Sequence, residues 1–319
     1  MRSTVRSSRL ATLAAFAAAG TLALAGVTPA GATSAVTFVG SFGDDANICS
    51  SPQQPCRTLN SAYDKTVAGG QINILDGGLY TGLEISKSIT VDGEAAKDAV
   101  IPLIIVETED ADVVVLRGLV VNATIRPGIS FSGSGTLQVE GCVIDGILSN
   151  TGGPDGIRLL PTGESRVSIA DTVVRNFALN DGHGLRLVAE NAGLIRLSLE
   201  RVSLVGNDVG MGIVSLRGGD GVMASVRDSM VAQNHRHGIE VSSVPLSDVM
   251  IERTGIVGNG MIGVHSEGNA TVRLRTVTVT HNGTGIGTGI LPGAILSYGD
   301  NVIDANGTNG TPTEVGTLK

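Results

Sequence analysis

The sequence predicts an all-β solenoid, a chain that coils with three short strands in each turn. The 319 residues include 45 glycines, no tryptophan and only 16% charged residues. Valine, isoleucine and leucine occur in short runs between glycine and asparagine, which favours strands and turns over helices. In addition, a glycine–aliphatic dipeptide and an asparagine recur along the chain at nearly constant steps, which is typical of a repeat architecture.

The first 32 residues have the features of a secretory signal peptide. Arg2, Arg6 and Arg9 form a basic start, and a long apolar stretch follows them. Ala30 and Ala32 occupy the small-residue positions of a cleavage site, which predicts cleavage after Ala32. No later apolar run is long enough to span a membrane. We therefore expect a secreted or periplasmic protein.

The charge of the chain argues against two classes of partner. The formal charge is −8 and becomes −11 when the three arginines of residues 1–32 are removed. Such an acidic chain is poorly suited to nucleic acid or to an anionic membrane surface, because both repel it.

The three cysteines divide into a pair and a single residue. Cys49 and Cys56 are close together in a chain that we expect to be exported, which favours a disulfide. A metal pair is the weaker alternative, because no histidine or second cysteine pair is nearby. Cys142 falls in an inward column of small residues, where we expect a buried and inert thiol.

The repeat itself has two markers. The first is a glycine followed by an aliphatic residue, at steps of 28, 28, 28, 26, 25 and 22 residues: Gly128, Gly156, Gly184, Gly212, Gly238, Gly263 and Gly285. The second is an asparagine that ends a short apolar stretch, and it predicts an internal asparagine ladder made of Asn122, Asn207, Asn234, Asn259, Asn282 and Asn306.

The physical basis of this pattern is a stack of coils. Strands of successive coils would lie about 4.8 Å apart, and alternation along each strand would point the aliphatic side chains inward. Asparagine fits a bend because it tolerates a left-handed backbone. Its amide both donates and accepts, so stacked asparagines can bond to one another.

On these repeats, residues 71–310 resemble the right-handed parallel β-helix proteins of the pectin-lyase-like superfamily. Residues 33–70 are similar to the N-terminal segment of exported bacterial proteins of this kind, in which a cysteine-bounded loop and a short helix precede the first coils. Residues 311–319 form a C-terminal tail. The resemblance implies the fold and not one activity, because this fold hosts lyases, hydrolases, epimerases and adhesins.

The N-terminal segment contains a matching candidate for the short helix. Thr58 is suited to cap residues 59–68, in which Leu59, Ala62 and Tyr63 would form the buried stripe. Such a helix would cover the open end of the coil, which otherwise exposes unpaired strand edges.

His183 stands in a Gly-His-Gly sequence, as does a histidine of the polygalacturonases that share this fold. Their Asn-Thr-Asp and Arg-Ile-Lys motifs are absent, and Asp44–Asp45, the one Asp-Asp pair, lies outside the coils. His183 is therefore interpreted as one member of a tolerant bend column, made of Pro127, Asp155, His183, Met211, His237, Ile262 and Thr284.

Two enlarged loops, residues 145–156 and 176–184, point to a possible site. Insertions in a solenoid lie on one face, often the binding face. Arg158 and Arg186 should point outward one coil apart, where they repel each other unless an anion is near. That anion could be an acidic sugar, or Asp155 or Asp181 of the protein itself. The remaining site candidates are His183 as a catalytic residue and Phe177 as an aromatic contact for a ligand.

Two functions remain open. The favoured one is a non-catalytic scaffold or binding protein of the cell envelope or extracellular space, with an acidic polysaccharide or a surface glycan as its partner. The alternative is a polysaccharide-active enzyme, pectate-lyase-like or polygalacturonase-like, with Asp155, Asp181, His183, Arg158 and Arg186 at its site. No metal or cofactor is expected, and calcium enters only under the lyase alternative.

Overall fold

A computed structural model describes residues 34–124, 126–146, 155–178 and 181–316. The predicted signal peptide, residues 147–154 and 179–180 of the enlarged loops, and residues 317–319 lie outside the described residues. Among those described, no helix is long and apolar enough to cross a membrane.

The N-terminal segment packs a short helix next to the first strands. Strand β1 (Ser34–Val39) pairs with β2 (Thr66–Ile74), and α1 (Leu59–Lys65) lies between them in sequence. The Thr58 side chain accepts a hydrogen bond from the Ser61 amide at 3.2 Å and so caps the helix. The helix is shorter than residues 59–68, because Thr66 is already extended and begins β2. The predicted disulfide joins Cys49 and Cys56.

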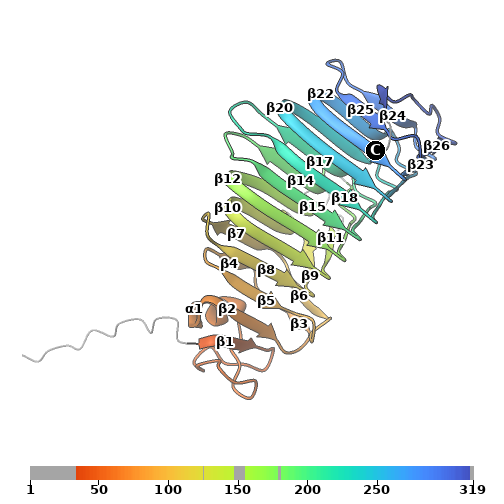
Figure 1. The fold of residues 1–319 in the computed structure, drawn as a ribbon. Helices are drawn as coiled ribbons and strands as arrows, with labels where there is room; N and C mark the ends of the chain where they lie inside the picture. Colours follow the sequence, from red (N-terminus) through yellow and green to blue (C-terminus); the bar gives the residue numbers. More distant parts are fainter. Residues whose placement is uncertain (1–33, 125, 147–154, 179–180, 317–319) are drawn as a thin grey trace, which may run out of the picture. The chain divides into compact units, whose positions relative to one another are not determined.

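The remaining chain is a right-handed parallel β-helix with three faces, and Figure 1 shows its strands stacked coil upon coil. Face 1 comprises β4 (Leu83–Ile85), β7 (Ile104–Thr108), the first halves of β10 (Ile129–Glu140) and β12 (Ile157–Ala170), β14 (His183–Ala189), β17 (Val209–Ser215), the first halves of β20 (Ile239–Glu252) and β22 (Ile262–Arg275), and β24 (Thr284–Thr288).

Face 2 begins with β1 and β2 and includes the second halves of the four long strands. Its other members are β5 (Ile89–Asp92), β8 (Val113–Arg117), β15 (Ile195–Glu200), β18 (Val222–Arg227), β25 (Ala294–Ser297) and β27 (Glu314–Val315). Face 3 is a separate sheet of β3 (Gly78–Leu79), β6 (Ala99–Ile101), β9 (Val120–Ala123), β11 (Val143–Gly146), β13 (Val173–Arg175), β16 (Ser203–Val205), β19 (Met230–Ala232), β21 (Gly255–Val257), β23 (Thr278–Thr280) and β26 (Val302–Asp304).

Alternate side chains of each strand point into the coil and form one core. In β10, Ile129 and Phe131 are fully buried, whereas Ser130 and Ser132 lie on the outer surface. The Cys142 thiol is buried in this core, as expected, and burial raises its pKa to about 11. The outward positions between the core residues carry the side chains that can meet a ligand.

The repeated glycines stack in one column, but one predicted member is wrong. Leu185 pairs with Met211, so Gly184 stands opposite Gly210 and not Gly212. A Cβ on Gly210 would lie 2.5 Å from the carbonyl oxygen of the next glycine in the column, which explains why this position excludes a side chain. Gly212 is an outward position of the strand. The sequence could not separate the two because both glycines precede an apolar residue.

The asparagine ladder forms inside the coil over five successive turns. Each amide nitrogen donates to the amide oxygen of the following asparagine, at 3.2, 2.8, 2.8 and 2.9 Å along Asn207, Asn234, Asn259, Asn282 and Asn306. The amide oxygens also accept from backbone N–H groups at the bends, for example from Asn234 N at 3.2 Å. Buried backbone groups at these bends are thereby satisfied.

Two details of the ladder differ from the sequence interpretation. Asn122 is not a member, because it pairs with Asp145 on face 3, two positions before the ladder column. The left-handed residue is the one before each ladder asparagine, such as Gly206 (φ 67°) and Gln233 (φ 55°). The asparagines are therefore selected for their side-chain hydrogen bonds and not for their backbone conformation.

Candidate functional site

A buried carboxylate organises the part of face 1 next to the enlarged loops. Asp155 is fully buried and accepts a hydrogen bond from Arg158 Nε at 2.5 Å. Its other oxygen accepts from the His183 backbone N–H at 3.1 Å and lies 3.3 Å from His183 Nδ1. The structure thus brings three of the predicted site residues into direct contact.

The charge state of this cluster follows from its hydrogen bonds. Burial acts to raise the pKa of Asp155, but the hydrogen bonds from His183 and Arg158 outweigh it and hold that pKa below its usual range. His183 Nδ1 also lies 2.7 Å from the carbonyl oxygen of Asp181. Because Nδ1 faces only acceptors, a neutral His183 ring carries its proton there and leaves Nε2 as an acceptor.

Arg158 and Arg186 pair in register on β12 and β14, so they stand one coil apart on the outer surface. Arg186 is half-buried, and no hydrogen bond or ion pair joins it to another described residue. The same outward position holds Gly212 and Glu240 in the next two coils. We call Arg158, Arg186, Gly212, Glu240 and His265 the face 1 row.

The face 1 row has no side chain at Gly212, and the His183 ring packs over this position. A Cβ there would lie 2.6 Å from His183 Cδ2 and 2.9 Å from His183 Nε2, so the ring occupies the space that a side chain would need. His183 Nε2 therefore lies against Gly212, which is one coil beyond Arg186. In the next coil the equivalent of His183 is Val209, and not Met211 as the sequence suggested.

Asp181 does not pair with either arginine of the row. It forms an ion pair with Arg236, which also lies 3.4 Å from Asp208. Arg236 is two coils further along and was not a predicted site residue. Asp181 thus contributes its backbone carbonyl to the site through His183, whereas its side chain is directed elsewhere.

Phe177 is not available to a ligand, and the prediction of an aromatic contact is wrong. Only 1% of Phe177 is exposed. Its backbone N–H donates to the Asn207 side chain at 3.2 Å, so it occupies the first position of the ladder column inside the coil. Asn176, the residue before Phe177, adopts the left-handed conformation of the bend (φ 67°). Because this asparagine comes one residue before the ladder position, the sequence did not show that Phe177 occupies that position.

A histidine pair extends the row in the C-terminal direction. The rings of His237 and His265 stack with centroids 5.6 Å apart, and His265 Nδ1 lies 3.8 Å from Glu240 Oε1. Burial lowers the pKa of His237. His237 occupies the same bend position as His183, two coils later. The recurrence of histidine at this position was the feature of the sequence that could have indicated the histidine pair.

The outward side of face 2 contains basic residues that sequence reasoning missed. Arg166 and Arg196 pair in register there and line a groove. Their signal was present as the related segments "RVSI" (166–169) and "RLSL" (196–199). Among the described residues, no group of three or more His, Cys, Asp or Glu is placed to hold a metal ion.

Comparison with known proteins addresses the fold. No protein-family model and no curated protein matches the chain. The crystal structure of pectate lyase Pel9A matches with a TM-score of 0.50 and 15% identity, covering 89% of this chain and 78% of that one. The fold is that of the pectin-lyase-like β-helix proteins.

Other solved structures match with lower TM-scores. The periplasmic alginate epimerase AlgG gives a TM-score of 0.49 at 12% identity, covering 78% of this chain and 76% of that chain. A rhamnogalacturonan lyase gives 0.36 at 11% identity, covering 86% and 88%. At these identities the likeness concerns architecture, and the chemistry has to be argued from this chain's own residues.

Proposed function

We propose that this protein is an exported β-helix that binds an acidic polysaccharide along the face 1 row. The observation that carries the proposal is the position of Arg186, an outward cation beside Arg158 with no partner among the described residues. Asp155 already neutralises Arg158. A carboxylate of a ligand would supply Arg186 with the bidentate partner that the protein does not.

The geometry of the row suits an extended chain of sugars. Neighbouring strands are about 4.8 Å apart, so a ligand lying across the strands meets one side chain in each coil. His183 covers Gly212 next to Arg186, and Glu240 and His265 offer groups for hydroxyls beyond it. Pectate, after which the structurally similar pectate lyase Pel9A is named, is a polymer of this charged kind.

The binding we propose is mainly electrostatic. Sugar-binding clefts often use exposed aromatic platforms, but Phe177 is buried. Affinity should therefore depend on Arg186 and fall with added salt, since exposed charges are screened over about 8 Å at physiological ionic strength.

Export rests on two features. The basic and apolar composition of residues 1–32 is that of a secretory leader. The disulfide between Cys49 and Cys56 supports an oxidising compartment, the periplasm or the extracellular space.

A second candidate function is cleavage of the bound polysaccharide, and the contact between Asp155 and His183 favours it. A buried carboxylate that orients a histidine through its Nδ1 is the arrangement of a general base. With a uronate carboxylate on Arg186, His183 Nε2 could remove the proton next to that carboxylate, and the glycosidic oxygen would leave. The product would carry a carbon–carbon double bond.

One experiment separates these functions. The purified chain is titrated with polygalacturonate and with alginate, with and without calcium, and with neutral dextran as a control. Saturable binding to the polyuronates without an increase in ultraviolet absorbance supports a binding protein. An increase that His183→Ala abolishes supports a lyase. Equal behaviour of polyuronates and dextran would contradict the proposal.

A further inference from the structure

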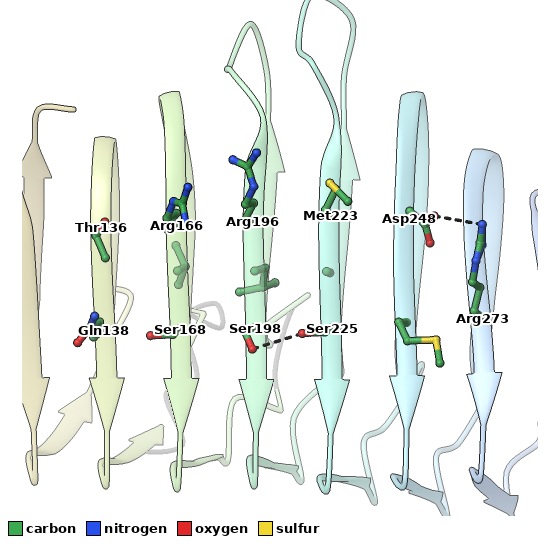
Figure 2. Close-up of a pocket in the computed structure, with 14 residues that line it drawn as sticks. Thr136, Gln138, Arg166, Ser168, Arg196, Ser198, Met223, Ser225, Asp248 and Arg273 are labelled. Carbon is green, nitrogen blue, oxygen red and sulfur yellow. Dashed lines mark hydrogen bonds and ion pairs between the residues drawn. The ribbon is translucent and has the colours of Figure 1, made fainter. Parts of the chain in front are cut away.

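Face 2 has a groove that does not include the face 1 row. Its volume is about 650 Å³, within the range of small-molecule sites. Figure 2 shows two rows of outward side chains on its strands. One row is Thr136, Arg166, Arg196, Met223 and Asp248, and the other is Gln138, Ser168, Ser198, Ser225, Met250 and Arg273.

One end of the groove has an excess of positive charge. Arg166 pairs in register with Arg196, so two guanidinium groups start from adjacent strands. Arg196 has Glu164 at 2.5 Å, whereas no hydrogen bond or ion pair links Arg166 to the described part of the chain. Adjacent cations repel unless an anion lies between them. In a protein of net charge −8, this end is suited to an anionic group.

The opposite end also has an unused donor. Arg273 forms an ion pair with Asp248 at 3.2 Å, which Figure 2 shows as a dashed line. Its second terminal nitrogen, Nη1, is buried and has no hydrogen-bond partner among the described residues. A buried donor without a partner is costly, and a polar atom of a ligand could satisfy it.

The middle of the groove is apolar. Met223 is 53% exposed between Arg196 and Asp248, and Met250 lies diagonally from it, on the next strand and in the second row. Apolar atoms contribute most of the surface that lines the groove. Exposed thioethers adapt to apolar ligands of varied shape. A polysaccharide, with hydroxyls on every edge, would leave these apolar surfaces poorly matched.

We propose that this groove binds a small amphipathic anion. A carboxylate, sulfate or sulfonate would lie between Arg166 and Arg196, and an aromatic or aliphatic body would cover Met223 and Met250. The row of serine hydroxyls, in which Ser225 Oγ donates to Ser198 Oγ at 3.3 Å, would bond to the polar edge of the ligand. This site is independent of the function proposed for face 1.

The test uses 8-anilinonaphthalene-1-sulfonate, whose fluorescence rises when its aromatic body leaves water. The folded protein should bind one molecule saturably. Arg166→Ala/Arg196→Ala should weaken binding by about tenfold or more, because it removes charge-assisted hydrogen bonds. Met223→Ser should also weaken binding and lower the fluorescence gain.

Two control variants make the same chemical changes elsewhere on the surface. Arg201→Ala/Arg253→Ala removes two exposed arginines that are paired with Asp171 and Asp228. Met230→Ser removes an exposed methionine of face 3. Both should bind the dye as the natural protein does, and thermal unfolding of each variant checks that the fold is retained.

Three results would overturn the proposal. The first is unchanged dye affinity in a folded Arg166→Ala/Arg196→Ala protein. The second is an equal loss of affinity in the control variants. The third is displacement of the dye by polygalacturonate, which would make the groove a polysaccharide site. Loss of polygalacturonate binding in a face 1 variant that still binds the dye would confirm that the two sites are separate.

Discussion

Arg158 and Arg186 occupy equivalent outward positions on β12 and β14, but only Arg158 has a carboxylate partner among the described residues, Asp155, at 2.5 Å. Arg158 therefore neutralises a buried carboxylate of the fold, whereas Arg186 is the cation that we propose for a ligand. This difference decides what each substitution should do.

Arg158→Ala should destabilise the protein, because it leaves the buried Asp155 carboxylate without its cation. We expect a loss of about 1–3 kcal/mol in the free energy of unfolding. Arg186→Ala should change it by less than about 0.5 kcal/mol, as is usual for a surface position. Denaturant titrations of both variants measure the difference, and equal losses would show that Arg186 also has a structural role.

The contribution of Asp155 to the stability of the fold should be lost at acid pH. Its pKa is lowered in the folded state, so its stabilising contribution is present above the pKa of an unfolded aspartate, about 3.9. That contribution is lost as the pH falls through the folded value. At neutral pH the natural protein should be more stable than Asp155→Asn, and the gap should narrow below about pH 4. A constant gap from pH 7 to pH 3 would contradict this assignment.

The register of β14 and β17 predicts opposite outcomes for two nearby glycines. Gly210→Ala places a methyl group 2.5 Å from a backbone carbonyl oxygen and should cost about 1–3 kcal/mol in unfolding free energy. Gly212→Ala meets only the His183 ring, and it should cost less than Gly210→Ala because a side chain can shift more readily than the backbone. If Gly212→Ala were the more damaging change, the glycine column would pass through Gly212 after all.

Substitution of a ladder asparagine should lower the free energy of unfolding, whereas substitution of an asparagine outside the ladder should not. Asn259→Ala removes the partner of Asn234 and Asn282 and should cost about 1–3 kcal/mol in unfolding free energy. Asn122→Ala is the matched control, because Asn122 is a half-buried outward residue outside the ladder. Similar unfolding midpoints for the two variants would mean that the internal hydrogen bonds contribute little.

The fold was largely predictable from the sequence because a β-helix is a local repeat. Alternating aliphatic residues and a recurrent asparagine were enough to place Asn207, Asn234 and Asn259 inside the coil. The errors occurred where the repeat changes length. The sequence interpretation assigned Gly212 to the glycine column in place of Gly210, because both glycines precede an apolar residue. It also missed that Phe177 occupies the ladder position, because the asparagine of that coil, Asn176, comes one residue earlier.

The candidate site was only partly predictable. The outward pair Arg158 and Arg186 followed from their spacing. The choice of partners did not, because Asp181 pairs with Arg236 two coils away, a contact that depends on how the loop folds back. The groove at Arg166 and Arg196 was missed because it lies on regular strands, where no enlarged loop marks a binding face.

The central claim is that Arg186 holds an anionic group of a polysaccharide. The most direct measurement is calorimetric titration of polygalacturonate into the natural protein and into Arg186→Ala, with Arg201→Ala as the charge-matched control. We predict that the face 1 variant, still folded by its melting curve, loses binding by about tenfold or more, while the control binds as the natural protein does. Equal affinity of all three proteins would contradict the claim.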